Sequence, residues 1–364
     1  MLPTTVHDGD PYRAFVNQRI FPCLDGLRCL SILAVIAFHT FGHETSFRLV
    51  EHGHLGVELF FAISGFLITT LLLRERARTG SISLRGFYVR RSLRIFPLYF
   101  AVLALYVLIV SFLERDLVTK TSFFGNLPFF ATYTSNWFVP LDQGDRVIFY
   151  FAWSLATEEQ FYLVWPLALG FLRGTIAPLV FMVALFAVDQ VAEGLVSRSL
   201  LDSHELGTKV ATSIATPICL GSILALLLDR ERTFHMLQPL LVGKATALVM
   251  FAALVAAICW PGMPMLGIHV LMVLLVGAAV LRANHWLAPL LENRVVKYLG
   301  QISYGLYLLH MLALNLAKRG MPSLTGAPRF ALTLVIAVGA AALSYRFFEG
   351  PILRFKDRLG QRAA

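Results

Sequence analysis

Long apolar runs separated by short polar links dominate the chain from residue 24 to residue 348. A helix needs about 20 apolar residues to cross the hydrocarbon of a bilayer, and most runs approach that length. Unbroken runs also exclude a membrane β-barrel, whose strands alternate between polar and apolar residues. The pattern therefore predicts an all-α, polytopic membrane bundle of about ten transmembrane helices. The expected spans are 24–41, 55–73, 95–113, 153–172, 175–192, 210–228, 242–260, 265–282, 298–316 and 328–348.

The polar links carry the information on orientation. Ten crossings place both termini on one side, and Lys and Arg are about twice as numerous in the links of that side as in the others. Because cytoplasmic links are enriched in positive charge, both termini are expected in the cytoplasm. The segment 123–137 is apolar but short, so we expect it to lie at the interface or to re-enter without crossing. The range 142–146 should then be an exposed turn.

Composition supports an integral membrane protein and excludes an ordinary soluble enzyme. Of the 364 residues, 57% are hydrophobic and 15% are charged, against about 45–50% apolar residues in a soluble domain. The net charge of +9 follows the expected topology, so nucleic acid is not an expected partner, whereas the lipid bilayer is. We expect a cytoplasmic leader at 1–23, a membrane domain at 24–351 and a basic cytoplasmic tail at 352–364. The first apolar run lacks a cleavage site and should remain as an anchor.

The four cysteines have no paired spacing, which predicts reduced thiols and neither a disulfide framework nor a metal site. An oligomer is possible, but the sequence does not indicate one.

The first span contains three ionisable residues on one helical face: Asp25, Arg28 and His39. A charged side chain facing lipid costs at least about 2.5–3.5 kcal/mol, so this face should meet protein or water and is a candidate functional site. The alternative is an Asp25–Arg28 pair anchored among the headgroups, with His39 as a packing residue.

The second span carries Glu58 close to its start, at a depth similar to that of His39 across the expected hairpin. A carboxylate beside an imidazole fixes its tautomer and raises its basicity, so we predict that Glu58 and His39 form a catalytic pair. The alternative is an interfacial glutamate that reaches water. Small residues at Gly53, Gly56 and Gly65, together with Ser64, should let neighbouring helices approach closely.

Seven arginines and no lysine fall between residues 74 and 94. Lysine would serve the topology equally well, and guanidinium is the group suited to bidentate phosphate recognition. Arg91 and Arg94 lie on one helical face, and together with Arg90 they are candidates for binding a phosphorylated cofactor. Contact with lipid headgroups is the alternative.

Three later segments also place ionisable or hydroxyl groups at the ends of spans. Glu158 shares a helical face with large aromatic residues and should point into the bundle. Further along, Tyr304, Tyr307 and His310 step three residues apart on one face, and Glu349 follows the last apolar run.

Taken together, the motifs resemble the acyltransferase 3 family of membrane-bound O-acyltransferases from about residue 24 to residue 351. The motifs that carry the resemblance are LDGLR with the histidine at the end of the span, GVELFF with SGFL, RRSLRIFPLY, WSLATEEQFY, ISYGLYLLH and FFEGP. The resemblance implies a ten-helix domain of the bacterial cytoplasmic membrane that moves a short acyl group from acyl-coenzyme A to a hydroxyl. The implied acceptor is a sugar of a surface polysaccharide or of a glycosylated natural product such as a macrolide.

The resemblance also implies roles for individual residues. Arg28 and His39 match the essential pair of the first span, and Arg91 and Arg94 match the pair tied to acyl-coenzyme A. Glu158 and Glu349 match the acids of their motifs. No metal is implied. Some relatives append a hydrolase-like domain that this sequence lacks, so transfer is expected to be completed within the membrane domain.

We therefore expect a polar site formed by the spans 24–41, 55–73, 153–172, 298–316 and 328–348, with a passage lined by Arg28, His39, Glu158 and Tyr307. His39 would act as the general base. Two alternatives are a covalent acyl-histidine intermediate and a transporter that uses the intramembrane acids and histidines as a proton relay. A transporter predicts paired broken spans related by an inverted repeat, and no repeat is evident in the sequence.

Overall fold

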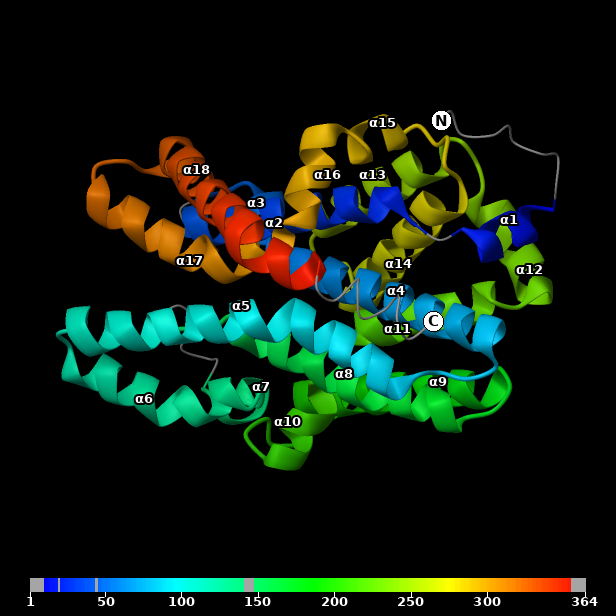
Figure 1. Ribbon diagram of the computed structural model, residues 1–364, viewed down its shortest axis with the longest axis horizontal. Coiled ribbons are helices and arrows are strands. Elements are labelled where there is room, and N and C mark those ends of the chain that lie inside the picture. The colour runs from blue at the N-terminus through cyan, green and yellow to red at the C-terminus, as the bar shows by residue number, and fades with distance from the viewer. Residues whose placement is uncertain (1–9, 19, 43–44, 141–146, 355–364) are drawn as a thin grey trace.

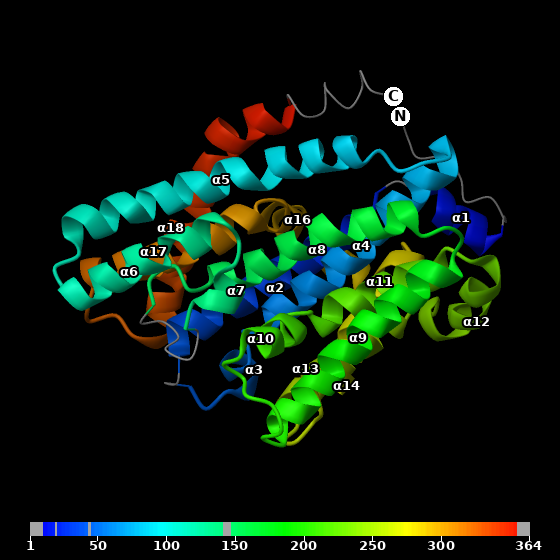
Figure 2. The ribbon, with the colours of Figure 1, turned by 90° about the horizontal axis from the view of Figure 1, so that it is seen from below.

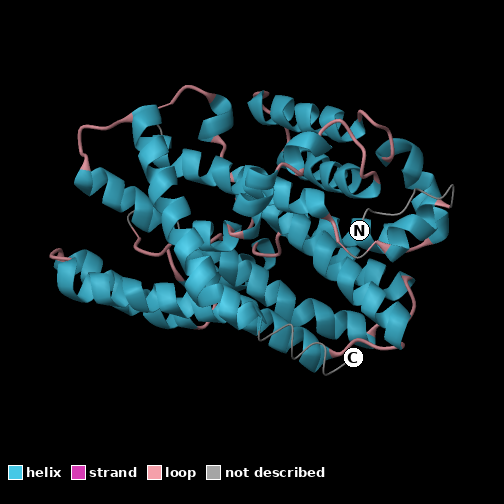
Figure 3. Cartoon of the chain, turned by 45° about the horizontal axis from the view of Figure 1, so that its top comes forward, coloured by secondary structure: helices cyan, strands magenta, loops and turns pink. Residues whose placement is uncertain are grey.

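The computed structural model describes residues 10–18, 20–42, 45–140 and 147–354, which form helices and no strands (Figures 1 and 3). The predicted turn at 142–146, the start of the leader at 1–9 and most of the tail lie outside the described residues. The longer helices are α2 (Pro22–Phe41), α4 (Leu55–Thr79), α5 (Leu84–Leu113), α6 (Leu117–Ala131), α8 (Ala152–Phe171), α9 (Ile176–Ser197), α11 (Thr216–Leu228), α13 (Thr246–Cys259), α14 (Met265–Leu281), α17 (Ser303–Gly320) and α18 (Gly326–Ser344). The shorter ones are α1 (Pro11–Asn17), α3 (Arg48–Glu51), α7 (Ser135–Phe138), α10 (Leu206–Thr212), α12 (Glu231–Leu241), α15 (Ala288–Leu291), α16 (Arg294–Gln301) and the π-helix η3 (Tyr345–Glu349).

The all-α prediction is confirmed, and each of the ten expected spans is helical over most of its length. Within the described part of the chain, five helices are long and apolar enough to cross a membrane by themselves: α2, α4, α5, α9, and α18 continued through η3. The number rises to seven if each of two bent pairs is one span, with 43° between α10 and α11 and 71° between α12 and α13. The chain is thus a multi-pass membrane protein, whereas ten crossings and the side of the termini stay predictions.

Two segments differ from the expected pattern. Helix α5 begins at Leu84, well before the predicted start at residue 95, because its first turns are polar and arginine-rich and so escape a hydropathy pattern. The hydroxyl of Ser83 caps this start by accepting from the amide of Gly86 at 3.2 Å. The segment 123–137, which was predicted to be interfacial or re-entrant, forms most of α6 and the short α7, and Figure 1 shows α6 returning alongside α5.

Helix α4 is the element around which the others pack. It contacts α2, α8, α11 and α14, and Figure 2 shows it among these helices, away from the outer helix α5. A Cβ added at Gly56 would overlap the carbonyl oxygen of Ser31 in α2, and one added at Gly65 would overlap that of Ile218 in α11. The predicted close approach at these glycines is therefore confirmed.

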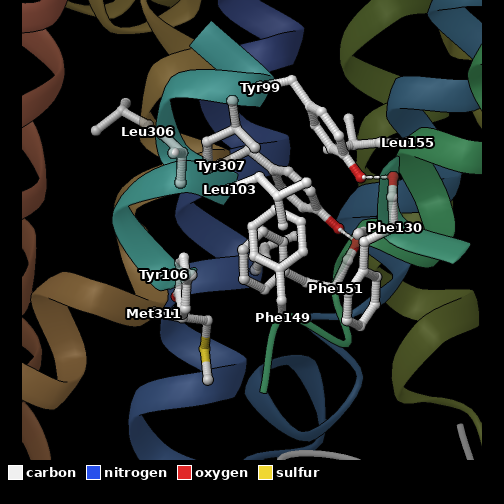
Figure 4. Close-up of a cluster of buried hydrophobic side chains, with 14 of the residues drawn as sticks. Tyr99, Leu103, Tyr106, Phe130, Phe149, Phe151, Leu155, Leu306, Tyr307 and Met311 are labelled. Atoms are coloured by element: carbon white, nitrogen blue, oxygen red, sulfur yellow. Dashed lines mark hydrogen bonds between the residues drawn. The ribbon is translucent and has the colours of Figure 1, made fainter. Parts of the chain in front are cut away.

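The helices that enclose the candidate site form two groups. In Figure 1, α17 and α18 form a hairpin beside α2, while α5, α6 and α8 lie together across from them. An aromatic core joins the groups (Figure 4). Within it, the hydroxyl of Tyr99 donates to the carbonyl oxygen of Phe130 at 2.8 Å, and that of Tyr307 donates to the carbonyl oxygen of Phe151 at 3.1 Å.

Candidate active site

A cavity of about 360 Å³ lies between α2, α4, α5, α8 and α17. On α4 its wall extends from Val57 to Glu75, and eighteen residues of helix correspond to about 27 Å. The cavity is therefore a long passage, with Glu75 and Arg90 at an arginine end and with Ser154 and Tyr307 at a tyrosine end. Helix α5 lines it and α18 does not, which corrects the predicted set of spans. The reason is packing, because α18 contacts α17 and α2 and does not reach the cavity.

Several of the clustered arginines have structural partners. Arg74 donates to the carbonyl oxygens of Phe15 and Gln18, which holds the leader against α4. Arg76 donates to the carbonyl oxygens of Leu169 and Leu172, at 3.3 and 3.2 Å, and so caps the end of α8.

Arg90 lines the arginine end and is paired with Glu75 at 3.1 Å between Nη2 and Oε2. The Arg90 side chain is 43% exposed and that of Glu75 is 17% exposed. Because Glu75 neutralises part of its charge, Arg90 is a weaker candidate for binding phosphate than the sequence suggested.

Arg91 and Arg94 line the passage and form no ion pair with any carboxylate in the described part of the chain. The guanidinium of Arg91 lies over the ring of Tyr162, 3.9 Å from its centroid, and Nε of Arg91 is buried without a hydrogen-bond partner. A cation over an aromatic face is held in place but keeps its charge. The two residues therefore present positive charge to whatever enters the passage.

The sequence left open whether Asp25 and Arg28 belong to a functional site or form an anchoring salt bridge, and the structure shows features of both. Nη1 of Arg28 lies 3.0 Å from Oδ1 of Asp25, so the predicted salt bridge forms. Arg28 also lines the passage, so the pair faces protein and not lipid.

Glu158 points into the passage, as its helical face predicted. Its carboxylate accepts hydrogen bonds from the hydroxyls of Ser64 and Tyr162, and Tyr162 also lies 3.1 Å from Ser64. These bonds join α4 to α8 and fix the position of the carboxylate at the middle of the passage.

Two tyrosines of α17 also line the passage. The Tyr304 hydroxyl donates to the carbonyl oxygen of Ile95 at 2.8 Å, which ties α17 to α5. The hydroxyl of Tyr307 lies 2.7 Å from that of Ser154. This pair marks the far end of the passage wall.

Two histidines lie beyond this end of the passage, next to Tyr307. The ring centroid of His310 is 5.4 Å from that of Tyr307 and 5.1 Å from that of His39. The hydroxyl of Tyr150 lies 3.0 Å from Nδ1 of His39 and 3.3 Å from Nε2. His39 is not part of the passage wall, so the expected lining is correct for Arg28, Glu158 and Tyr307 but not for His39.

The tautomer of His310 follows from its contact. Nδ1 of His310 is hydrogen-bonded to the carbonyl oxygen of Tyr307. Because a carbonyl oxygen only accepts, Nδ1 carries the proton and Nε2 is the basic nitrogen. The site thus holds two imidazole rings in contact with each other, and the tautomer of one of them, His310, is fixed.

Glu58 does not lie where the sequence predicted. Its Oε2 is 3.8 Å from Nε2 of His269 in α14, and in the described part of the chain it makes no hydrogen bond or ion pair with His39. Position 58 turns toward α14 because Gly56 and Val57 already occupy the faces toward α2 and the passage. The predicted catalytic pair of Glu58 and His39 is therefore wrong.

Glu349 lies in the π-helix η3, outside the passage wall. Its carboxylate accepts from the hydroxyl of Ser344 at 3.1 Å and packs against Gly305 of α17. Helix η3 also contacts α5, and Glu349 is a charged neighbour of Arg94, so it can act on the passage through that side chain as well as through the position of α17.

Two contacts of the site were not anticipated. Tyr150 precedes α8 in a link with no apolar period, so no helical pattern could place it against His39. Ser64 was expected only as a small packing residue, yet it donates to Glu158. Among the residues that the structure describes, no group of three or more His, Cys, Asp or Glu could hold a metal ion, and all four cysteines are free thiols.

Comparison with known proteins decides the family. The profile described as "Acyltransferase domain" matches residues 21–346, which is nearly the whole described chain. The chain belongs to the acyltransferase 3 family. No solved structure matches it.

Curated relatives of the chain are O-acetyltransferases by name, and two of them are named for peptidoglycan. The chain is 27% identical to the peptidoglycan O-acetyltransferase OatA of Listeria monocytogenes, over 92% of this chain and 56% of that protein. It is 28% identical to YrhL of Bacillus subtilis, also named for peptidoglycan O-acetyltransfer, over 94% of this chain and 56% of that protein. An O-acetyltransferase of Staphylococcus aureus shows 29% identity over 93% of this chain and 58% of its own. The chain thus spans a little over half the length of these relatives.

Proposed function

We propose that this membrane O-acyltransferase takes its acyl group from acyl-coenzyme A and delivers it to a sugar hydroxyl. The observation that carries the proposal is the passage itself, which begins beside Arg91 and Arg94 and ends against the layer of His310 and His39. A long, narrow passage with unpaired guanidinium groups near one end suits a slender acyl donor with phosphates at one end.

The donor would bind with its phosphates at the arginine end. Arg91 and Arg94 offer planar donors that match phosphate oxygens, and Arg28 adds a third positive charge along the same wall. The pantetheine arm would then extend along α4 towards Ser154 and Tyr307. By the charge bias of the links, the arginine end would face the cytoplasm of a bacterial cell, where the donor is made.

Transfer would occur behind the tyrosine end. His39 would take the proton of the acceptor hydroxyl as its oxygen attacks the thioester carbonyl. The new C–O bond forms, the C–S bond breaks, and the leaving thiolate takes the proton. General-base assistance of this kind contributes typically about 10²–10⁴-fold. Tyr150 and His310 would position the His39 ring. The hydrogen-bonded hydroxyls of Tyr307 and Ser154 line the end of the passage next to this layer and would have to part when the donor enters.

The acceptor would be a sugar-containing molecule, either a cell-surface polysaccharide such as peptidoglycan or a glycosylated natural product such as a macrolide. The names of the relatives support the first class. The transporter alternative gains no support, because the two bent helix pairs follow each other directly in the chain. An inverted repeat would place them in corresponding positions of two halves.

The test uses full-length protein in detergent with acetyl-coenzyme A labelled in the acetyl group. Peptidoglycan fragments and a glycosylated macrolide are offered in parallel. We expect thiol release that depends on one acceptor, together with label in an alkali-labile ester on that acceptor. Release without acceptor labelling, or no release with either acceptor, would overturn the proposal. Stable label on the protein itself, lost in a His39→Ala variant, would instead favour the acyl-histidine route.

A further inference from the structure

A second cavity, of about 410 Å³, lies outside the passage. Its wall is formed by the end of α4 with the link to α5, and by the end of α8 with the link to α9. It shares no lining residue with the passage. More than half of its wall residues are exposed, so the cavity opens to the surface of the protein.

The charge of this second cavity is positive. Its wall contains Arg76 and Arg173, and no Asp or Glu of the described chain lines it. Arg173 is exposed and forms no ion pair with any described residue. Asp229 is a charged neighbour of Arg76, but it lies outside the wall and does not form an ion pair with Arg76.

Arg76 keeps hydrogen-bond donors for a ligand. A guanidinium has five N–H groups. Nη1 of Arg76 donates to the carbonyl oxygens of Leu169 and Leu172, and Nη2 donates to that of Gly174 at 3.4 Å. Among the described residues, Nε and the second hydrogen of Nη2 therefore remain for another acceptor. Because carbonyl oxygens are neutral, these bonds leave the charge of Arg76 intact.

The surroundings of the cavity favour a lipid over a soluble anion. Phe171 lines the cavity and is 78% exposed, and Ile176, which begins α9 directly after the wall residue Thr175, is 63% exposed. Both apolar side chains lie at ends of expected spans, where exposed apolar groups meet lipid chains. The hydroxyls of Ser81 and Thr175 also lie on the wall and can donate to phosphate oxygens.

We propose that this cavity binds the phosphate of an anionic phospholipid, with Arg76 and Arg173 as donors and with the acyl chains along Phe171 and Ile176. Both links belong to the positively charged side that is expected in the cytoplasm, and basic pockets on that side bind anionic headgroups. A zwitterionic lipid fits less well, because its own cation would meet two arginines and no carboxylate of the described chain. The site is separate from the proposed acyl transfer and does not rest on it.

The test is native mass spectrometry of full-length protein in a neutral detergent, titrated with phosphatidylglycerol or with phosphatidylcholine of the same acyl chains. We expect one phosphatidylglycerol to bind more tightly than phosphatidylcholine. Arg173→Gln should weaken the binding of phosphatidylglycerol about fivefold or more, because it removes one charge at the headgroup. Arg198→Gln is the matched control, since it changes an exposed arginine at the other end of α9, outside the wall.

Three outcomes would overturn the proposal: equal affinities for the two lipids, equal affinities of the Arg173→Gln and Arg198→Gln variants, or displacement of phosphatidylglycerol by inorganic phosphate. The last would show that the cavity takes a free anion. Arg173 carries the test because Arg76 also holds the end of α8, and thermal unfolding of Arg173→Gln without added lipid should match that of the wild type. Failure of acyl transfer would not affect these readings, since no acyl donor or acceptor is present.

Discussion

The arginines between residues 74 and 94 share one side-chain type but have different roles. Arg74 and Arg76 satisfy backbone carbonyl groups, and Arg90 pairs with Glu75. Only Arg91 and Arg94 combine a place on the passage wall with the lack of an ion pair among the described residues. A guanidinium without a fixed anionic partner is the one available to a ligand.

The lack of an ion pair at Arg94 among the described residues predicts that this residue affects the KM for the acyl donor. Replacing Arg94 with Ala removes a charge-assisted hydrogen bond of about 1.5–3 kcal/mol, so the KM for acyl-coenzyme A should rise at least about tenfold. Arg94→Lys should recover part of the loss, because it restores the charge but not the planar fork. Arg78→Ala is the matched control, since Arg78 is exposed and does not line the passage. Equal KM values for Arg94→Ala and Arg78→Ala would show that Arg94 does not bind the donor.

The histidine layer predicts a loss of rate without a loss of fold. His39→Ala should lower kcat by about 10²-fold or more while thermal unfolding in detergent stays close to that of the wild type. Tyr150→Phe removes the hydroxyl that contacts His39 and should cause a smaller loss. A well-folded His39→Ala variant with more than about a tenth of wild-type activity would exclude His39 as the base.

At the scale of elements, the apolar runs of the sequence predicted where each helix lies. They could not predict which neighbouring helix each of its faces would contact. The face of Glu58 depends on α14, which lies more than two hundred residues further along the chain, so a local pattern placed this residue beside the wrong histidine. The start of α5 was missed for the opposite reason, because polar turns at the end of a span have no hydropathy signal. Glu158 was predicted well because its own helix carries the large aromatic residues that turn inward.

Helix contacts at small residues give a prediction with an internal control. Gly65→Ala places a methyl group against the carbonyl oxygen of Ile218 in α11, and overpacking of this kind costs about 1–3 kcal/mol. Gly339→Ala in α18 meets no atom within 4 Å and should be neutral or slightly stabilising. Thermal unfolding of the two variants in one detergent would test this, and equal midpoints would mean that α4 and α11 are less closely packed than described.

At the scale of the whole molecule, the passage gives the protein a direction. Its arginine end lies beside the link between α4 and α5, and its tyrosine end meets the histidine layer about 27 Å further along α4. If the donor enters at one end and the acceptor reaches His39 from the other side, the hydrogen-bonded hydroxyls of Tyr307 and Ser154 lie between the two substrates. The sequence could not predict that the two ends belong to one passage, because five separate helices form its wall.

The direction of the passage can be tested by labelling one added cysteine. Leu71 lines the passage one helical turn from Glu75 and is 44% exposed, so Leu71→Cys should react with a membrane-impermeant thiol reagent applied from the cytoplasmic side. Coenzyme A should slow that reaction, because its arm would occupy the same space. Ser81→Cys, in the exposed link at the same end, should be labelled from the same side without protection. Wild-type protein measures the background, since three native cysteines are buried and only Cys259 is partly accessible.

The comparison of the two cysteine variants separates topology from binding. Labelling of both from the outside only would place the arginine end away from the cytoplasm, so a cytoplasmic donor could not enter there. Labelling of both from the cytoplasm, with equal rates in the presence and absence of coenzyme A, would keep the topology but remove the donor from the passage. Protection of Leu71→Cys alone is the expected result, because only that side chain lies on the wall that leads from Arg91 and Arg94 to Tyr307.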